Sequence, residues 1–372
     1  MTIAVVANSA WYLFNFRLRL MHALQAQGHR VIAIAPTDAY AARLGEAGID
    51  CVDWTLAAGG MHPWQELRSV LALRRLLAAH AVRLAFTYTP KANIYTGLAA
   101  RGLPLAHVPN VSGLGRAFID RNLLTRLVTG LYRIAFGRAH KVVFQNDDDE
   151  AEFLRAGLVD AARTLRVPGS GVDLERFSPA PWPANAAEEP VFLFVGRVLR
   201  DKGAREFADA ARQLRQRSPR AAFRILGSVM ADNPTAIPAA QWQAWSEQGL
   251  VELLGSTDDV RPHLAAASCV VLPSYREGVP RALLEAAASA RPCIATDVPG
   301  CRDAVVDGQT GLLCAARDAN ALADAMQRFL DVGVDAWQRM GKAGRAYMEA
   351  NFDEKRVIET YLRLARALDD RT

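Results

Sequence analysis

The chain of 372 residues has few of the features that mark metal sites, disulfide frameworks or membrane spans. Its five cysteines, at positions 51, 269, 293, 301 and 314, include no C-x-x-C pair, and its seven histidines include no H-x-x-x-H spacing. We therefore expect no metal site and no disulfides, and cysteines that occupy core positions in a reducing compartment. No apolar run approaches the roughly 18 residues that a membrane-spanning helix needs. The first residues, MTIAVVANSAW, have no basic segment before the apolar ones, so we expect no signal peptide.

A glycine-rich turn is also missing after the first expected strand. Ile3–Ala7 has the unbroken apolar character of a buried strand, and the next segment, Asn8–Arg19, reads NSAWYLFNFRLR. A dinucleotide-binding unit needs glycines at this point, so we expect no such cofactor there. The segment is instead aromatic. It fits a surface for an apolar ligand and, equally, a hydrophobic cap on the core; its aromatic residues are Trp11, Tyr12, Phe14 and Phe16.

The net charge of +5 is unevenly distributed. Residues 1–180 contain 20 Lys and Arg against 14 Asp and Glu, a balance of +6, whereas the remaining residues have a balance of −1. Nucleic acid is one conceivable partner for a basic half, but no nucleic-acid-binding motif or basic-aromatic platform is present. An anionic membrane surface or an acceptor that carries a diphosphate fits the charge better.

Apolar strand-like runs alternate with helical stretches along the whole chain. This alternation predicts an α/β fold in which parallel sheets carry helices on both faces. Two of the helical stripes are Leu18/Met21/Leu24 and Leu67/Leu71/Leu73/Leu76/Leu77. The expected strands are Ile3–Ala7, Val31–Ala35, Cys51–Trp54, Leu84–Thr87, Leu105–Val108, Lys141–Gln145, Val191–Val195, Phe223–Leu226, Val251–Leu254, Cys269–Leu272 and Cys293–Thr296.

The length suits two domains of ordinary size. Pro179–Pro190 is rich in Pro, Ala and Glu and is interpreted as a linker. We therefore expect a first domain over residues 1–180, a second over residues 181–350, and a terminal helix within residues 351–372. That helix would carry Val357, Tyr361, Leu364 and Leu368 on one stripe.

Arg116–His140 has the pattern of a basic amphipathic helix. Such a helix can lie on anionic lipid, or it can pack on the sheet with a solvated basic face, and the sequence leaves both interpretations open. The expected apolar stripe is Leu124, Leu127, Val128, Leu131, Ile134 and Ala135, with Arg121, Arg126, Arg133 and Arg138 largely outside it.

The most informative stretch is residues 272–300, LPSYREGVPRALLEAAASARPCIATDVPG. A buried strand, Cys269–Leu272, is followed by a loop that contains Glu277 and by an Ala/Leu-rich helix, Arg281–Ala290, that contains Glu285. Open α/β sheets bind ligands at the carboxyl ends of their strands, and the backbone amides of Gly278 and Val279 would favour an anionic group there. A carboxylate at position 285 could accept two hydroxyl hydrogens, as a ribose offers. Each glutamate taken alone is also compatible with a solvated turn or helix residue.

This stretch resembles the Glu-x7-Glu signature of retaining glycosyltransferases of family 4, which have the GT-B fold. The matching residues run from Glu277 to Glu285, through Arg291-Pro292 to Pro299-Gly300, and on to the Asp307-Gly308-x-x-Gly311-Leu312-Leu313 segment. Two residues depart from the usual pattern: Ala290 replaces a glycine, and Asp303 replaces a glutamate. The resemblance implies two Rossmann-like domains facing a cleft, with the terminal helix crossing back to the first domain.

The resemblance also implies the donor site. Arg197 and Lys202, in Gly196-Arg197-Val198-Leu199-Arg200-Asp201-Lys202-Gly203, would hold the donor diphosphate and act in catalysis, with Glu277 contacting the sugar and Glu285 the ribose. No metal would then be needed. The further donor-binding residues are Gly196, Gly255, Gly278, Val279 and Pro280.

Two segments of the first half are similar to a subgroup of these transferases that extends lipid-linked saccharides for bacterial surface polysaccharides or glycoproteins. They are Thr89-Pro90-Lys91-Ala92-Asn93 and Asn110-Val111-Ser112-Gly113-Leu114-Gly115-Arg116. The similarity implies that an acceptor contacts Lys91, Asn110, Ser112 and Gly113. Alternatively, Lys91 is a surface lysine and the glycines form an ordinary turn.

The sequence therefore predicts a retaining, metal-independent transferase that moves a hexose or N-acetylhexosamine from a nucleotide sugar, with UDP as the expected nucleotide, to a lipid-linked saccharide. We expect it in the cytoplasm, peripherally associated with the inner face of the cell membrane. Two alternatives remain: a nucleotide-sugar 2-epimerase of the same fold, and a nucleotide-sugar-binding protein without catalysis.

Overall fold

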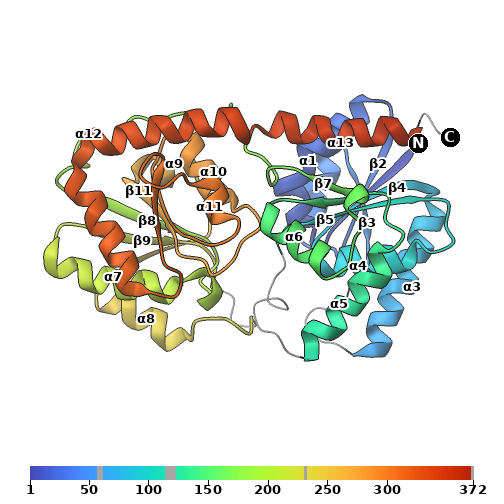
Figure 1. Cartoon of the computed structure of the whole chain (residues 1–372), viewed down its shortest axis with the longest axis horizontal. Helices are drawn as coiled ribbons and strands as arrows, with labels where there is room; N and C mark the ends of the chain where they lie inside the picture. The colour runs from blue at the N-terminus through green and yellow to red at the C-terminus, as the bar shows by residue number, and fades with distance from the viewer. Residues whose placement is uncertain (57–61, 114–122, 230–232, 370–372) are drawn as a thin grey trace. The chain divides into compact units, whose positions relative to one another are not determined.

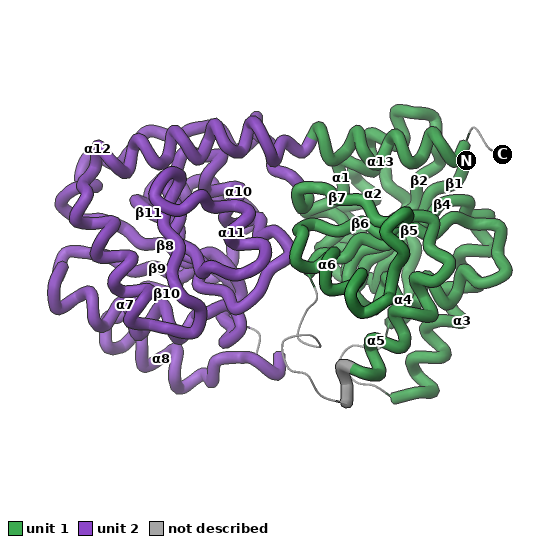
Figure 2. Tube along the Cα trace, in the orientation of Figure 1, with its two compact units in different colours: residues 1–170, 355–372 green, residues 171–354 purple. Residues whose placement is uncertain are grey.

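The computed structural model describes residues 1–56, 62–113, 123–229 and 233–369 (Figure 1). Contacts divide the chain into two compact units, which we call unit 1 (residues 1–170 and 355–372) and unit 2 (residues 171–354) (Figure 2). Each unit is built on one parallel sheet. The predicted α/β fold with two Rossmann-like units is thus confirmed.

Unit 1 contains a seven-stranded sheet with the order β3-β2-β1-β4-β5-β6-β7. After their first residues, β1 and β2 are unbroken apolar runs, as expected for strands that are covered on both faces. The last strand, β7, was not predicted, because it is short and only partly buried. The strands are β1 (Thr2–Val6), β2 (Arg30–Ala35), β3 (Asp50–Asp53), β4 (Val82–Tyr88), β5 (Ala106–Val111), β6 (Val142–Phe144) and β7 (Thr164–Arg166).

Helices cover both faces of this sheet (Figure 1). On one face, α1 (Ala10–Ala26), α2 (Ala39–Glu46) and α13 (Glu354–Asp369) pack against side chains such as Ile3 and Val5. On the other face, α3 (Pro63–Ala79), α4 (Pro90–Ala99), α5 (Leu123–Phe136) and α6 (Asp147–Arg155) pack against Ala4 and Val6. The alternation of neighbouring residues along β1 between the two faces is the normal consequence of strand geometry.

The core-facing stripes of α3 and α5 differ from the predicted ones. Leu67 and Leu71 of α3 are 48% and 45% exposed, and Leu127 and Ile134 of α5 are 55% and 46% exposed. The faces that pack on the sheet contain Ser69, Leu73 and Leu77 in α3 and Tyr132, Ala135 and Phe136 in α5. The stripe prediction was thus right in part, since Leu73, Leu77 and Ala135 do face the sheet, and it failed elsewhere because both helices have apolar residues on two faces. The part of the predicted amphipathic helix before Leu123 lies outside the described residues.

The terminal helix α13 packs on unit 1. Its side chains Val357, Tyr361, Leu362 and Ala365 belong to the same buried cluster as the strands of that sheet. The ring of Tyr361 lies edge-on to Phe86 of β4, with 5.0 Å between ring centroids.

Unit 2 contains a six-stranded sheet with the order β10-β9-β8-β11-β12-β13. One face packs on α7, α8 and the first part of α12, and the other on α9, α10, α11 and the end of α12. The elements are β8 (Val191–Val195), α7 (Ala204–Arg217), β9 (Ala222–Leu226), α8 (Ala239–Glu247), β10 (Glu252–Gly255), α9 (Arg261–Ala266), β11 (Cys269–Leu272), α10 (Arg281–Ala288), β12 (Cys293–Thr296), α11 (Cys301–Ala304), β13 (Gly311–Cys314) and α12 (Ala319–Asn351). None of the helices described is long and apolar enough to cross a membrane.

The segment predicted as a linker is held within unit 2. The guanidinium of Arg291, which is fully buried, donates hydrogen bonds to the carbonyl oxygens of Ala180 (3.0 Å) and Pro181 (2.6 Å). Val172 also exchanges backbone hydrogen bonds with Phe352 and Glu354. These contacts place the boundary between Ser170 and Gly171, about ten residues before the position expected from composition.

A buried hydrogen-bond chain in unit 1 fixes the protonation state of His107. The Thr87 hydroxyl donates to Asn93 Oδ1 (2.7 Å), because the Asn93 amide already donates to the carbonyl oxygen of Asn110. His107 Nε2, at 3.0 Å, must therefore donate to Thr87 Oγ1, and its buried Nδ1 has no partner among the described residues. Burial lowers the pKa of His107 to about 3, because the charged imidazolium would lose its hydration there.

This neutral histidine makes the stability of unit 1 pH-dependent. Unfolded histidine titrates near pH 6.5, so between that value and about 3 the unfolded chain binds the additional proton. The free energy of unfolding should thus fall as the pH falls from 6.5, with a slope of up to about 1.4 kcal/mol per pH unit from this residue. In His107→Gln that contribution should disappear. Urea unfolding at a series of pH values measures it. The exposed His22, changed to Gln, is the control, and equal slopes for both variants would contradict the assignment.

Candidate functional site

The predicted donor residues of unit 2 lie at the carboxyl edge of its sheet. The order β10-β9-β8-β11-β12-β13 reverses direction between β8 and β11, and ligands of open α/β sheets bind at such a switch point. Gly196 and Arg197 directly follow β8, and Ser274 and Glu277 lie in the loop after β11. The two loops that flank the switch point therefore contain the residues expected to catalyse the reaction.

Glu277 is the centre of a hydrogen-bonded cluster in this region. Its Oε1 forms an ion pair with Lys202 Nζ and accepts a hydrogen bond of 2.5 Å from the Ser274 hydroxyl. The side chains of Lys202 and Glu277 are only 20% and 12% exposed, so the pair is partly removed from water. The Thr296 hydroxyl in turn donates to the carbonyl oxygen of Ser274. The structure thus joins a predicted phosphate ligand to the predicted sugar ligand.

Two glycines bring the backbones of this region into close contact. Gly203, which ends the short turn containing Lys202, has φ +75°, and a Cβ there would lie 2.1 Å from the carbonyl oxygen of Pro273. Gly300 has φ +81°, and a Cβ there would lie 2.1 Å from the carbonyl oxygen of Gly278. Only glycine fits both the left-handed backbone and the space. These contacts position the loop of Glu277 from two sides.

Arg197 differs from Lys202 in its surroundings. Its side chain is exposed, and it makes no hydrogen bond or ion pair with any residue that the structure describes. A guanidinium in this state presents all its donors to a ligand, and its planar fork suits a phosphate group. Arg197 and Lys202 both follow β8.

Glu285 lies in the second turn of α10 and pairs with Arg281 one turn earlier. The Arg281 Nε donates to Glu285 Oε1 at 3.0 Å, and both side chains are more than four-fifths buried. The helix begins at Arg281, as predicted, and ends at Ala288, two residues earlier than expected; Pro280 is its N-cap, and Gly278 and Val279 are buried in the preceding loop. Gly255, the last residue of β10, accepts a hydrogen bond from the Gly227 amide (2.8 Å).

The predicted acceptor residues of unit 1 have protein partners. Lys91 Nζ lies 2.8 Å from Glu66 Oε1, and the Tyr95 hydroxyl donates to the other oxygen of that carboxylate. Asn110 is 1% exposed; its amide donates to the Tyr361 hydroxyl (2.6 Å) and its Oδ1 accepts from Gln145 (3.0 Å).

Ser112 and Gly113, which are also predicted to contact the acceptor, follow β5 and are half-buried. Leu114, Gly115 and Arg116 lie outside the described residues. The residues of the aromatic cluster near the start of α1 differ in solvent exposure. Trp11 is 45% exposed, whereas Tyr12, Phe14 and Phe16 are half-buried.

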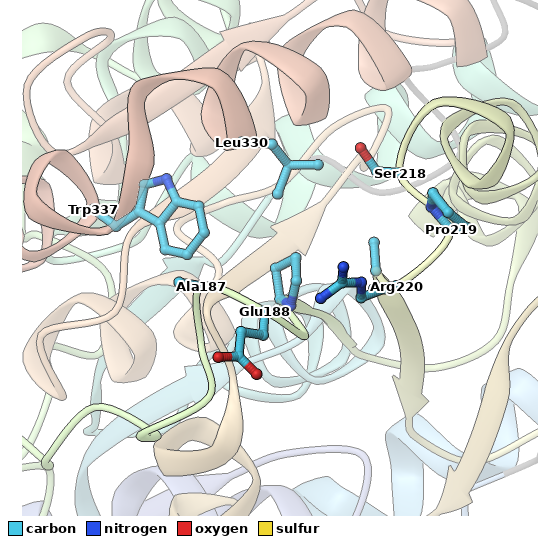
Figure 3. A pocket seen from close by; sticks show the side chains of 9 residues that line it. Ala187, Glu188, Ser218, Pro219, Arg220, Leu330 and Trp337 are labelled. Atoms are coloured by element: carbon cyan, nitrogen blue, oxygen red, sulfur yellow. The ribbon is translucent and has the colours of Figure 1, made fainter.

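A shallow pocket in unit 2 is not part of this arrangement (Figure 3). Its wall includes Glu188 and Pro190, just before β8, and Arg220 and Ala221, just before β9. These positions are at the amino-terminal edge of the sheet, opposite to Arg197 and Glu277. Across the described ranges, no cluster of three or more His, Cys, Asp or Glu side chains could hold a metal ion.

Comparison with known proteins agrees with this geometry. Residues 189–331 match the family described as "Glycosyl transferases group 1", and residues 15–170 match the "Glycosyl transferase 4-like domain". Both matches are to glycosyltransferase domains, and together they span most of the chain. The chain is a glycosyltransferase. The resemblance seen in the sequence is thereby confirmed.

Two relatives of this glycosyltransferase have names that state the reaction they catalyse. The N,N'-diacetylbacillosaminyl-diphospho-undecaprenol alpha-1,3-N-acetylgalactosaminyltransferase of Campylobacter jejuni is 26% identical over 98% of both chains. The UDP-Gal:alpha-D-GlcNAc-diphosphoundecaprenol alpha-1,3-galactosyltransferase of Escherichia coli is 27% identical over 72% of this chain and 71% of its own length.

Solved structures share the fold of the glycosyltransferase at lower sequence identity. The sucrose-phosphate synthase of Thermosynechococcus elongatus has a TM-score of 0.80 and 20% identity, with full coverage of both chains. Anabaena HepE, in a complex with UDP-glucose, has a TM-score of 0.80 and 17% identity, with 99% of this chain and all of the other covered. These similarities support the GT-B fold.

The sequence analysis missed several residues that contact the candidate site residues. Ser274 and Thr296 support Glu277, Arg281 pairs with Glu285, and Glu66 pairs with Lys91. The i,i+4 spacing of Arg281 and Glu285 was a usable signal for an ion pair. Glu66 and Lys91 are 25 residues apart and on different helices, so no local pattern connects them.

The contact of Gly203 with Pro273 gives a test of how the site is assembled. Gly203→Ala should lower the free energy of unfolding by about 4 kcal/mol or more, because the methyl group would overlap the backbone carbonyl of Pro273. Gly308→Ala is the matched control: Gly308 has φ +72° and open space around its Cβ position, so only backbone strain of about 1–2 kcal/mol applies. Urea unfolding measures both, and similar losses would show that the close contact is unimportant.

Proposed function

We propose that this glycosyltransferase moves a hexose or N-acetylhexosamine from a nucleotide sugar, with UDP as the nucleotide, to a lipid-linked saccharide of bacterial surface-glycan biosynthesis. The observation that carries the proposal is the Lys202–Glu277–Ser274 cluster at the switch point of unit 2, beside the exposed Arg197. The acceptor class is supported by the C. jejuni and E. coli relatives, both named for diphospho-undecaprenol acceptors.

In the proposed mechanism, Arg197 and Lys202 stabilise the leaving diphosphate. Negative charge grows on that group as the glycosidic bond breaks, and positive groups already in place lower the barrier most where charge develops. Because these two side chains supply the positive charge, the proposal requires no metal ion. Lys202 must exchange some of its contact with Glu277 for phosphate oxygens, and this exchange leaves Glu277 free to accept hydrogen bonds from the sugar.

The anomeric configuration is proposed to be retained. None of the donor-site side chains considered above is placed as an evident covalent nucleophile, so departure of the diphosphate and attack by the acceptor on the same face of the sugar is the proposed route. The retaining family that the Glu277–Glu285 signature resembles supports this assignment.

Transfer of label separates this function from its alternatives. The protein is incubated with labelled UDP-sugars and a bacterial lipid extract, and label entering the lipid fraction is the expected result. A 2-epimerase would release free or rearranged sugar without any acceptor, and a binding protein would leave the donor unchanged. Neither of the two relatives named above is an epimerase.

Glu285→Ala should weaken binding of UDP by about 10- to 100-fold, because the ribose hydroxyls lose a charged acceptor worth about 1.5–3 kcal/mol. Calorimetric titration of UDP measures the change. Glu349→Ala is the control, since Glu349 forms the same kind of i,i+4 ion pair with Arg345 (2.6 Å) in α12. Equal UDP affinity of the Glu285 and Glu349 variants would remove Glu285 from the site.

We also propose that unit 1 binds anionic bilayers through the exposed faces of α3 and α5. Figure 1 shows both helices on the same side of the sheet, separated by α4. Exposed apolar side chains are interleaved with exposed arginines, which is the pattern of an interfacial surface. The apolar residues are Trp64, Leu67, Leu71, Leu127 and Ile134, and the basic ones are Arg68, Arg75, Arg126, Arg133 and Arg138. Such binding supports the proposed location at the cytoplasmic face of the membrane.

Replacing Arg126, Arg133 and Arg138 with Gln should reduce co-sedimentation with anionic vesicles severalfold at low salt. Each basic residue near an anionic surface contributes about 1 kcal/mol, and salt screens this attraction. The control replaces Arg212, Arg217 and Arg220 of unit 2 with Gln and has the same net charge. If both triple variants bind vesicles as the parent does, α5 only packs on the sheet.

A further inference from the structure

Arg17, in the second turn of α1, is a buried cation without a counter-charge. It is 2% exposed, and its Nη2 donates one hydrogen bond, to the Tyr12 hydroxyl at 3.3 Å. Its Nε has no partner, and no carboxylate in the described part of the chain forms an ion pair with it. The guanidinium carbon lies 4.0 Å from the centre of the Tyr88 ring.

This environment leaves most of the binding capacity of Arg17 unused. A guanidinium has five N–H donors and stays protonated in proteins, so burial cannot be relieved by loss of the proton. The ring of Tyr88 compensates part of the charge through a cation–π contact. Buried charges are otherwise paired with an opposite charge, and Arg17 has none among the residues described. An anionic ligand would supply the missing partner.

The position of Arg17 in the fold is that of a ligand site. The unit 1 sheet reverses its strand order between β1 and β4. The helix that carries Arg17 follows β1, and Tyr88 is the last residue of β4. Arg17 therefore lies at the switch point of unit 1, where open α/β sheets receive ligands.

Thr89, the next residue after Tyr88, adds a second indication. Its backbone has φ +76° and ψ 146°, a region that residues with a side chain rarely adopt, and its hydroxyl is buried without a partner in the described structure. Such strain persists where the surrounding structure enforces it, often at ligand sites. Thr89 is also the N-cap of the ten-residue helix α4, whose N-terminal dipole favours negative charge.

We propose that Arg17, with the Thr89 hydroxyl, receives the diphosphate group of the acceptor. The inference rests on the proposed function, because a lipid-linked saccharide carries this group between lipid and sugar. It assigns the acceptor diphosphate to the β1/β4 switch point and separates it from the donor diphosphate, which Arg197 and Lys202 of unit 2 would hold.

Inorganic pyrophosphate tests the site directly. Its binding is measured by calorimetry on the full chain with UDP at saturation, so that the donor site is occupied. Arg17→Gln should weaken pyrophosphate binding by about 10- to 100-fold, and Arg17→Lys, which keeps the charge, should recover part of it. Arg83→Gln is the matched control: this exposed arginine lies at the opposite end of β4 and should leave the affinity unchanged. With a lipid-linked acceptor, the Michaelis constant for the acceptor should rise in Arg17→Gln.

Unchanged pyrophosphate affinity in Arg17→Gln, or no pyrophosphate binding by the UDP-bound parent protein, would overturn the proposal. If Arg17→Gln does not fold, Thr89→Val decides, since it removes the hydroxyl at nearly constant shape and should also weaken binding. Failure to bind UDP would be a failure of the proposed function instead. In that event the same comparison is made in an Arg197→Ala/Lys202→Ala background, which lacks the donor diphosphate ligands, and its result still supports or overturns the role of Arg17.

Discussion

The ion pair between Lys202 and Glu277 connects the two loops that flank the switch point of unit 2. Both side chains are mostly buried, so their attraction is less screened than that of a surface pair. Each charge compensates the burial of the other before any donor arrives. A donor diphosphate therefore competes with Glu277 for Lys202, and the exposed Arg197 is the natural first contact. The close backbone contact of Gly203 with Pro273 packs the two loops directly against each other.

Unit 1 uses the same topology with different chemistry. Its switch point has no carboxylate paired with the central cation in the described structure; tyrosine rings surround Arg17 instead. Nearby, Tyr361 of α13 accepts a hydrogen bond from Asn110, so the terminal helix completes the polar network at this edge of the sheet. A unit with a pre-paired cation suits a ligand that must be exchanged during reaction. A unit with an unpaired buried cation suits an anion that is held throughout.

Most strands, though not β7 and β13, and the Glu277–Glu285 signature were predictable from sequence, whereas the core-facing sides of α3 and α5 were predicted only in part. Buried parallel strands leave unbroken apolar runs, so β8, β11 and β12 were predicted at their observed bounds. In α3 and α5, apolar residues occupy two faces, and periodicity alone does not say which face meets the sheet. Ala290 shows a subtler limit: the sequence marks it as an unusual replacement for glycine, and the structure supplies the reason, a left-handed φ of +57° just after the cap of α10.

The sequence analysis did not single out Arg17, because aromatic residues dominate the segment that contains it. A segment reading NSAWYLFNFRLR is interpreted through its rings, and only the fold shows that one arginine turns inward onto Tyr88. The acceptor residues predicted from the family resemblance have the opposite character. Lys91 is paired with Glu66, so its ammonium would have to leave that carboxylate to bind an acceptor. Asn110 is committed to Tyr361 and Gln145. In the described part of unit 1, the buried cation at the β1/β4 switch point has no opposite charge, and the proposed acceptor diphosphate would supply one.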